Sequence, residues 1–219
     1  GWSGALQTAG GLVLIISLLA LGLPGNSSKT EKSTDREAES ELTLLKTING
    51  AMNHHGYLLL NVGFFVCGFH VAFIGTHLPS FLQAEGISIS TASWALAMIG
   101  LFNMFGSMIF GRMGDSLSKK NLLSLLYTLR AVVIAGFLAI PLNEITAIAF
   151  GAAIGFLWLA TVPLTSGIVA QVFGTRYLST LWAIVFFSHQ LGAFLGVWLG
   201  GRVYDATGSY TPVWLASIA

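Results

Sequence analysis

The chain has 219 residues, of which 54% are hydrophobic and only 9% are charged, and its formal net charge is +1. A soluble globular chain carries about a quarter charged residues because it must present a wet surface, so the composition excludes an ordinary water-soluble domain. No basic stripe points to a nucleic-acid partner, and the single cysteine, Cys67, excludes a disulfide framework within the chain.

Six stretches are long and apolar enough to cross a bilayer as helices, which takes ~20 residues. They cover residues 5–24, 57–82, 93–110, 122–142, 145–172 and 178–200, and a seventh begins near Thr211 and is cut off. We treat both ends of the chain as truncations. A signal peptide at residues 12–23 is disfavoured because no positive charge precedes it. Backbone polar groups in lipid must be satisfied within each segment, so the sequence predicts an all-α membrane protein.

Basic residues predict the orientation of these spans. The connections after the second, fourth and sixth spans carry only Arg202, whereas those after the first, third and fifth carry eight lysines and arginines. By the positive-inside rule, the connections after the first, third and fifth spans face the cytoplasm. Trp2, Trp94 and Trp198 fall at the opposite ends, as an interfacial aromatic belt requires. The eight basic residues are Lys29, Lys32, Arg36, Lys46, Arg112, Lys119, Lys120 and Arg176.

Residues 25–56 form the one long hydrophilic segment and hold nine of the nineteen charged residues. This shift in composition marks a boundary between two helix bundles. The mixed charges and serines favour a plain solvated linker. The alternative is a short helix on the membrane surface, because four apolar residues follow the acidic run. These are Leu42, Leu44, Leu45 and Ile48.

The stretch after the third span combines residues suited to a conformational gate. Gly111 ends the span, Asp115 follows four residues later, and Lys119 and Lys120 follow the acid. Glycine permits close helix approach, and the aspartate can pair with a cation or a helix N-terminus in one conformation. The lysines would hold a neighbouring helix end or lipid phosphates. Alternatively they are plain positive-inside anchors, which leaves the spaced Gly111 and Asp115 unexplained.

This stretch resembles the cytoplasmic loop motif of the major facilitator superfamily, G-x-x-x-D-R-x-G-R/K-R/K, with Ser116 in place of arginine and Ser118 in place of glycine. Residues 67–79 and 200–210 resemble the opening helix and the last loop of the second half of bacterial monocarboxylate-porter-like members. The resemblance implies the major facilitator fold. Residues 1–24 would be the last helix of its N-terminal bundle, residues 25–56 the central cytoplasmic linker, and residues 57–219 the C-terminal six-helix bundle, truncated in its last helix.

Two features of the predicted spans concern helix packing. Gly192, Gly196 and Gly200 share one face of the sixth span, which lets a neighbouring helix approach closely. Pro163 should kink the fifth span and free backbone carbonyls, which polar neighbours or cavity water must satisfy. Such discontinuities often line transport pathways, and a merely structural kink is the equal alternative.

Ionisable residues within spans are functional candidates because they are costly there. His70 and His77 are seven residues apart and so lie on nearly one stripe of the second span. With an ordinary pKa near 6.5, a histidine can exchange a proton under a physiological gradient. For His70, near mid-bilayer, the functional hypothesis is proton coupling or hydrogen bonding to a substrate. The equal alternative is a neutral histidine bonded across helices.

Arg130 is the only cation well inside a span, and no acid is embedded in any predicted span. A carboxylate substrate would supply the missing negative charge through a bidentate pair, and snorkelling to the cytoplasmic interface is the alternative. Oxalate–formate members of the wider family carry basic residues deep in the spans matching the third and sixth. This chain has Asn103 there, with His189 and Gln190, so that substrate is not carried over.

The sequence thus predicts a secondary transporter of a small organic solute, a monocarboxylate by resemblance, working by alternating access in the bacterial inner membrane. Its expected partners are the substrate, a proton as candidate coupling ion, membrane lipid and the N-terminal bundle of the same full-length chain. No phosphate-binding loop, cofactor motif or metal cluster is present. The rival hypotheses are a seven-helix receptor and a membrane-embedded enzyme, which needs a catalytic constellation that the sequence lacks.

Overall fold

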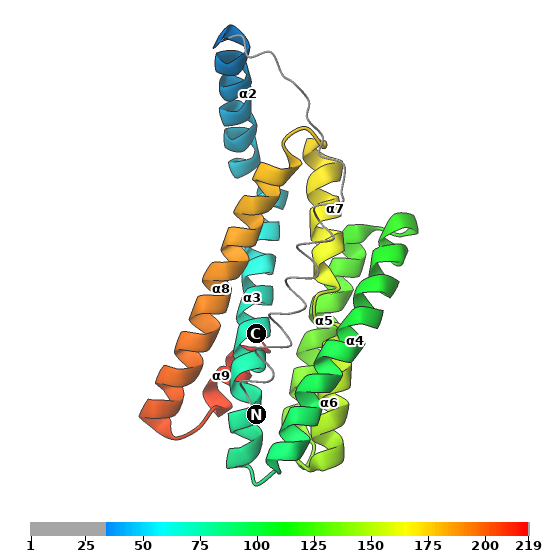
Figure 1. Cartoon of the computed structure of the whole chain (residues 1–219), viewed down its shortest axis with the longest axis vertical. Coiled ribbons are helices and arrows are strands. Elements are labelled where there is room, and N and C mark those ends of the chain that lie inside the picture. The colour runs from blue at the N-terminus through cyan, green and yellow to red at the C-terminus, as the bar shows by residue number, and fades with distance from the viewer. Residues whose placement is uncertain (1–33, 219) are drawn as a thin grey trace, which may run out of the picture. The chain divides into compact units, whose positions relative to one another are not determined.

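The computed structural model describes the backbone of residues 34–218 and the side chains of residues 43–218. Its contacts divide the chain into two units, Gly1–Glu41 and Leu42–Ala219. The predicted first span, residues 5–24, lies outside the described residues. Every regular element in the described part is a helix (Figure 1).

The predicted linker contains a helix, α2, at Thr34–Met52. The sequence had favoured a plain solvated segment there and kept a short helix as the alternative. The next helix, α3, spans His55–Ala84, and the His54 side chain caps its first turn by accepting the Tyr57 N–H at 3.3 Å. The residues between the two helices therefore form a short turn.

Five helical segments of the described chain are long and apolar enough to cross a membrane. They coincide with the second to sixth predicted spans; most ends lie one to seven residues beyond the predicted bounds, whereas α5 ends three residues before its predicted end. Their bounds are α3, α4 at Ile89–Ser116, α5 at Lys119–Ala139, α6 at Glu144–Phe156 joined with α7 at Thr161–Phe173, and α8 at Leu178–Thr207. A six-residue helix, α9, follows at Thr211–Ala216, where the seventh span was predicted to begin.

Hydroxyl and amide side chains set where several helices begin. Ser88 accepts the Thr91 N–H at the start of α4, Ser118 caps α5, and Asn143 forms a reciprocal capping box at the start of α6. Each bonds an N–H that has no partner within the first helical turn. The left-handed Gly208, at φ 69°, ends α8 before the turn into α9.

The bundle contains two tightly packed helix pairs, α3 with α8 and α4 with α6 (Figure 1). In the first pair, Gly68 lies on the carbonyl of His189, and Gly192 and Gly196 lie on the carbonyls of Phe65 and Phe69. In the second, Gly106 of α4 and Gly151 and Gly155 of α6 make equivalent backbone contacts. Small residues allow this approach, and dispersion contacts between the backbones replace the absent hydrophobic drive.

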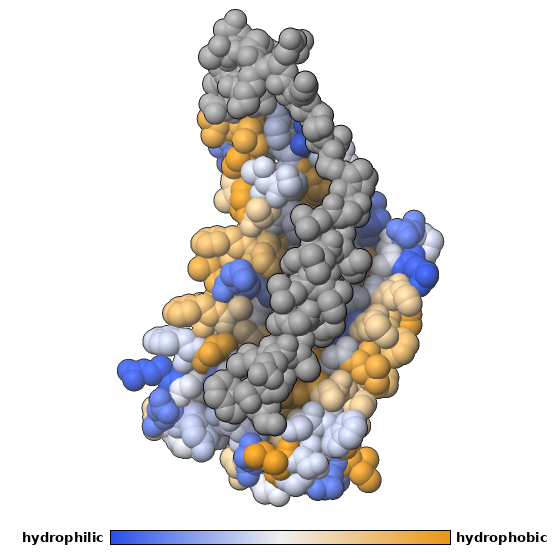
Figure 2. Space-filling view, in the orientation of Figure 1, coloured by the Kyte–Doolittle hydropathy of each residue, from blue (hydrophilic) through white to orange (hydrophobic). Residues whose placement is uncertain are grey.

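The flanks of α4 and α8 carry exposed apolar side chains, which appear as orange patches in Figure 2. Such faces would be unfavourable in water and are suited to lipid. The exposed residues include Leu101, Met104, Phe105 and Met108 on α4 and Phe187, Phe194 and Trp198 on α8.

Candidate functional site

The predicted fifth span is a helix broken in its middle, between Phe156 and Thr161. Pro163 explains the position of the break. Proline has no N–H to donate to the Leu159 carbonyl four residues earlier, and its ring clashes with that carbonyl in a regular helix. The Val162 N–H donates to Leu159 instead, at 3.0 Å. The sequence predicted a kink at Pro163, and the helix is interrupted about one turn before it.

Asn103 of α4 bonds an amide that the break leaves free. In an unbroken helix the Leu159 N–H would donate to Gly155, but the carbonyl of Gly155 accepts from Trp158 at 2.9 Å. The Asn103 Oδ1 accepts the Leu159 N–H at 3.0 Å. A buried unpaired amide costs about 1–3 kcal/mol, so this bond is what makes the interruption tolerable at that residue.

Arg130 of α5 bonds the carbonyls on the other side of the same break. Its Nε and Nη2 donate to the Leu157 carbonyl at 3.1 and 2.6 Å, and Nη2 also donates to the Trp158 carbonyl. These carbonyls close the C-terminal end of α6, where the partial negative charge of the helix dipole favours a cation. The guanidinium thus binds a helix end.

The Arg130 side chain is only 1% exposed. The alternative in which it extends to the cytoplasmic surface therefore does not hold. Its Nη1 donates to Cys67 Sγ at 3.2 Å, and that sulfur lies 3.4 Å from the Thr161 hydroxyl. Cys67 and Thr161 are fully buried, so a polar chain runs from α5 through α3 to the first residue of α7. Neither Cys67 nor Thr161 was predicted to have a role.

The charge of Arg130 has no acidic partner in the described part of the bundle. The acids among residues 43–218 all lie at helix ends or in turns. They are Glu85, Asp115, Glu144 and Asp205. Neutral carbonyl dipoles and one thiol surround the guanidinium instead, and the interior of the bundle consequently carries an unbalanced positive charge.

His189 and Gln190 adjoin each other on α8. The His189 ring is 8% exposed and stacks on Phe186 at 5.6 Å between centroids, with Phe64 on another side at 4.9 Å. Its Nδ1 lies 3.3 Å from the Gln190 Oε1, and Gln190 itself is exposed. The exposed Gln190 amide therefore presents a hydrogen-bond donor and an acceptor at the α8 surface, beside the buried His189 ring.

His70 and His77 have different neighbours although they lie on one stripe of α3. His70 is 7% exposed, and its Nδ1 has no hydrogen-bond partner among the described residues. It lines a cavity of about 580 Å³ with Tyr127 of α5 and Ser217 after α9. His77 Nε2 lies 3.0 Å from the Val197 carbonyl of α8, so this histidine is in contact with the backbone of a neighbouring helix.

The predicted gate motif surrounds the end of α4. Lys119 Nζ donates to the Gly114 carbonyl at 2.6 Å, and the methylenes of Lys119 lie close to Gly114 and Gly167 of α7. The lysine thus joins the α4 end to α7 within one bundle. Gly111 is half-buried near Pro163, whereas Asp115 and Lys120 are exposed.

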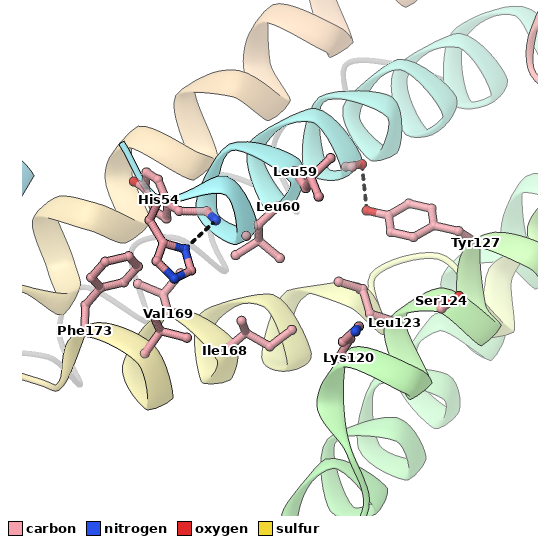
Figure 3. A pocket seen from close by; sticks show the side chains of 14 residues that line it. His54, Leu59, Leu60, Lys120, Leu123, Ser124, Tyr127, Ile168, Val169 and Phe173 are labelled. Carbon is pink, nitrogen blue, oxygen red and sulfur yellow. Dashed lines mark hydrogen bonds between the residues drawn. The ribbon is translucent and has the colours of Figure 1, made fainter. Parts of the chain in front are cut away.

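Lys120 lies at the rim of a second cavity, of about 510 Å³, between α3, α5 and α7 (Figure 3). Apolar side chains form most of its wall, with Leu60, Leu123 and Val169 among them. Figure 3 also shows the Tyr127 hydroxyl, which donates to the Gly63 carbonyl at 2.7 Å. Residues 43–218 hold no group of three or more metal-ligating side chains.

Comparison with known proteins gives a consistent result. The family model described as Major Facilitator Superfamily matches residues 1–197. Monocarboxylate transporter 12 of Rattus norvegicus is 26% identical over 98% of this chain and 50% of its own length. The uncharacterized MFS-type transporter YcxA of Bacillus subtilis is 27% identical over 69% of the chain and 38% of its own length. YhjX of Escherichia coli, also an uncharacterized MFS-type transporter, is 22% identical over 84% and 45%. The chain spans about half the length of the first of these relatives and a smaller share of the other two.

Proposed function

Because this chain belongs to the Major Facilitator Superfamily, we propose that the full-length protein moves a small monocarboxylate across the membrane by alternating access, coupled to a proton. The chain is part of a multi-pass integral membrane protein of a transporter family, and its relatives are named as transporters and not as enzymes. The seven-helix receptor is thereby left without support.

One observation supports an anionic substrate most directly. Arg130 places a full positive charge inside the bundle, and the acids among residues 43–218 lie at helix ends or in turns, where they do not balance it. In a low-dielectric interior such a charge acts over a longer distance than it does in water. An anion that enters the bundle is therefore attracted even though the guanidinium donors are already bonded to carbonyls. Relatives named monocarboxylate transporters fit this charge.

We assign contact with the solute to polar groups that the structure leaves accessible. The exposed Gln190 with the adjacent His189 supplies donors suited to a carboxylate. His70 is the candidate for proton coupling, since its Nδ1 has no bond to a described residue. His77, Asn103 and Arg130 would border the pathway through the helix contacts described above. The segment from Gly111 through Asp115 to Lys119 and Lys120 would stabilise one state of the cycle at the cytoplasmic side.

The proposed organisation of the full-length protein follows from the family. Residues 1–24 would end an N-terminal bundle, residues 25–56 would link the bundles on the cytoplasmic side, and residues 57–219 would belong to the C-terminal bundle. Two bundles rocking about a site near the bilayer midplane would give alternating access. The bacterial relatives favour the bacterial inner membrane as its location.

Uptake by the full-length protein in proteoliposomes tests this function. Radiolabelled lactate should accumulate when the lumen is more alkaline than the outside, and an uncoupler should abolish the accumulation. Ethanolamine, a cation of similar size, should not be transported, because Arg130 repels it. His70→Gln should retain downhill lactate uptake and lose the accumulation driven by pH, whereas the exposed His55→Gln should behave as the wild type.

Each part of the proposal has its own contrary result. Accumulation of ethanolamine in place of lactate would exclude an anionic substrate. Lactate flux that is indifferent to the pH gradient would remove the proton coupling and leave the substrate assignment standing.

A further inference from the structure

We propose that Arg130 is a positioning residue that fixes the break between α6 and α7, and that this break is a hinge of the transport cycle. The hinge role rests on the proposed function, and the positioning role does not. We call Arg130 and Asn103 together the break clamp.

The break clamp bonds three backbone groups at the interruption between α6 and α7. Arg130 takes the carbonyls of Leu157 and Trp158, and Asn103 takes the N–H of Leu159. Buried backbone groups need such partners. The two side chains come from α5 and α4, so the geometry of the break is fixed by helices other than its own.

The two halves of the broken span share α4 and α5 as neighbours, and α7 also packs against α3 and α8. α6 is packed through Gly151 and Gly155 against the backbone of α4. α7 contacts α5 and α8 as well as α4, and the Lys119 side chain packs against its Gly167. A rotation of α7 relative to α6 would leave the glycine contacts of α6 intact. It would, however, have to break or exchange the bonds of the break clamp.

The chemistry of Arg130 suits positioning better than direct binding of a solute. A guanidinium has five donors in a fixed planar fork, and this one uses Nε, Nη1 and Nη2 on carbonyls and a sulfur. Its 1% exposure leaves no path for a solute to reach it in this state. Lysine could keep the charge but could not bond both carbonyls with the same geometry.

Hydrogen exchange of the full-length protein tests the positioning role without any substrate. Arg130→Gln should raise amide exchange about tenfold in residues 157–170, because local opening there becomes easier. Exchange in α3 should not change. Arg202→Gln, at an exposed arginine of α8, is the matched control and should leave all segments as in the wild type. Arg130→Lys should give an intermediate increase, since charge at the α6 end is retained.

Pro163→Ala supplies the decisive background, because alanine restores the N–H that the Leu159 carbonyl lacks. If the break clamp acts as proposed, Arg130→Gln should change exchange of residues 157–170 at most twofold in the Pro163→Ala background. Should Arg130→Gln alone fail to fold, Pro163→Ala should restore folding. An equal increase in both backgrounds, or failure of the restoration, overturns the positioning role.

Lactate kinetics test the hinge. Arg130→Lys, which keeps the charge that attracts the anion, should lower Vmax about threefold or more and leave KM for lactate within about twofold, because the solute does not contact the guanidinium. A large rise in KM with unchanged Vmax would assign Arg130 to binding and overturn the hinge. If lactate is not transported at all, the proposed function fails while the exchange result still decides the positioning role. Unchanged amide exchange in Arg130→Gln together with active lactate transport would overturn the positioning role and leave the proposed function standing.

Discussion

Gly192 of α8 lies directly on the backbone carbonyl of Phe65 in α3, so closely that the position of a Cβ on residue 192 is already filled. The same relationship recurs one turn on, between Gly196 and Phe69. Backbone cannot move aside as a flexible side chain can, so α3 and α8 are locked at this separation by the absence of two side chains.

Gly192→Ala should therefore destabilise the bundle by about 1–3 kcal/mol, because the added methyl group overpacks the α3–α8 contact. Thermal unfolding of the full-length protein in detergent measures the effect. Gly201→Ala is the matched control on the same helix, since a Cβ there meets no atom within 4 Å. Equal midpoints for the two variants would show that the helices can separate at no cost, contrary to the close contact described.

Asn103→Ala should lower the free energy of unfolding by about 1–3 kcal/mol, because it leaves the Leu159 N–H without its acceptor inside the bundle. Asn103→Asp retains an acceptor oxygen at the same place. It should preserve the bond to Leu159, which hydrogen exchange at that amide reports. Identical exchange in both variants would mean that another group accepts from Leu159.

Lys119→Met should lower the free energy of unfolding by about 0.3–1 kcal/mol, the usual value of a cation at a helix C-terminus. The reason is the loss of the 2.6 Å bond from Nζ to the Gly114 carbonyl. Methionine keeps most of the stem that packs on Gly167. Lys120→Met, at the exposed neighbour, should stay within about 0.5 kcal/mol of the wild type. A reversed order of these two variants would contradict the assigned bond.

Tyr57→Phe should destabilise the bundle by about 0.5–1.5 kcal/mol, because it removes a buried hydrogen bond and leaves the ring packing intact. The Tyr57 hydroxyl donates to the Leu181 carbonyl at 2.7 Å and joins α3 to α8. Chemical unfolding monitored by tryptophan fluorescence measures the change. Tyr204→Phe, whose ring stacks on Tyr210 at 4.4 Å, tests whether loss of a hydroxyl alone has this effect; it should be close to neutral.

The second to sixth helical spans could be predicted from the sequence because each is a local property of an apolar stretch. The kink at Pro163 was equally local, since the missing N–H belongs to the residue itself. The sequence did not predict that the helix is interrupted at residues 157–160. That position depends on which carbonyl loses its donor and on which group replaces the donor. The helix in the linker was judged less favourable because charges and serines dominate its composition.

The candidate residues show the limit of periodicity. A spacing of seven places His70 and His77 on one stripe, but two helical turns separate them along the axis by about 10 Å. They consequently have different neighbours: His70 borders a cavity beside α5 and Ser217, and His77 contacts the α8 backbone. Cys67 was noted in the sequence only as a single cysteine. Its contacts with Arg130 and Thr161 join residues that are far apart in the chain.

The sequence by itself determined that this chain is a membrane protein and that its spans are helices. It also determined that one arginine and one proline lie within those spans, where both are unfavourable. Those facts follow from the free energy of transferring single residues and single backbone groups out of water. Only the tertiary structure decided that these two residues are related, because the guanidinium of Arg130 bonds carbonyls that the helix interruption near Pro163 leaves free. Such a pairing depends on how α5 lies against the α6–α7 break, and no local pattern encodes that distance.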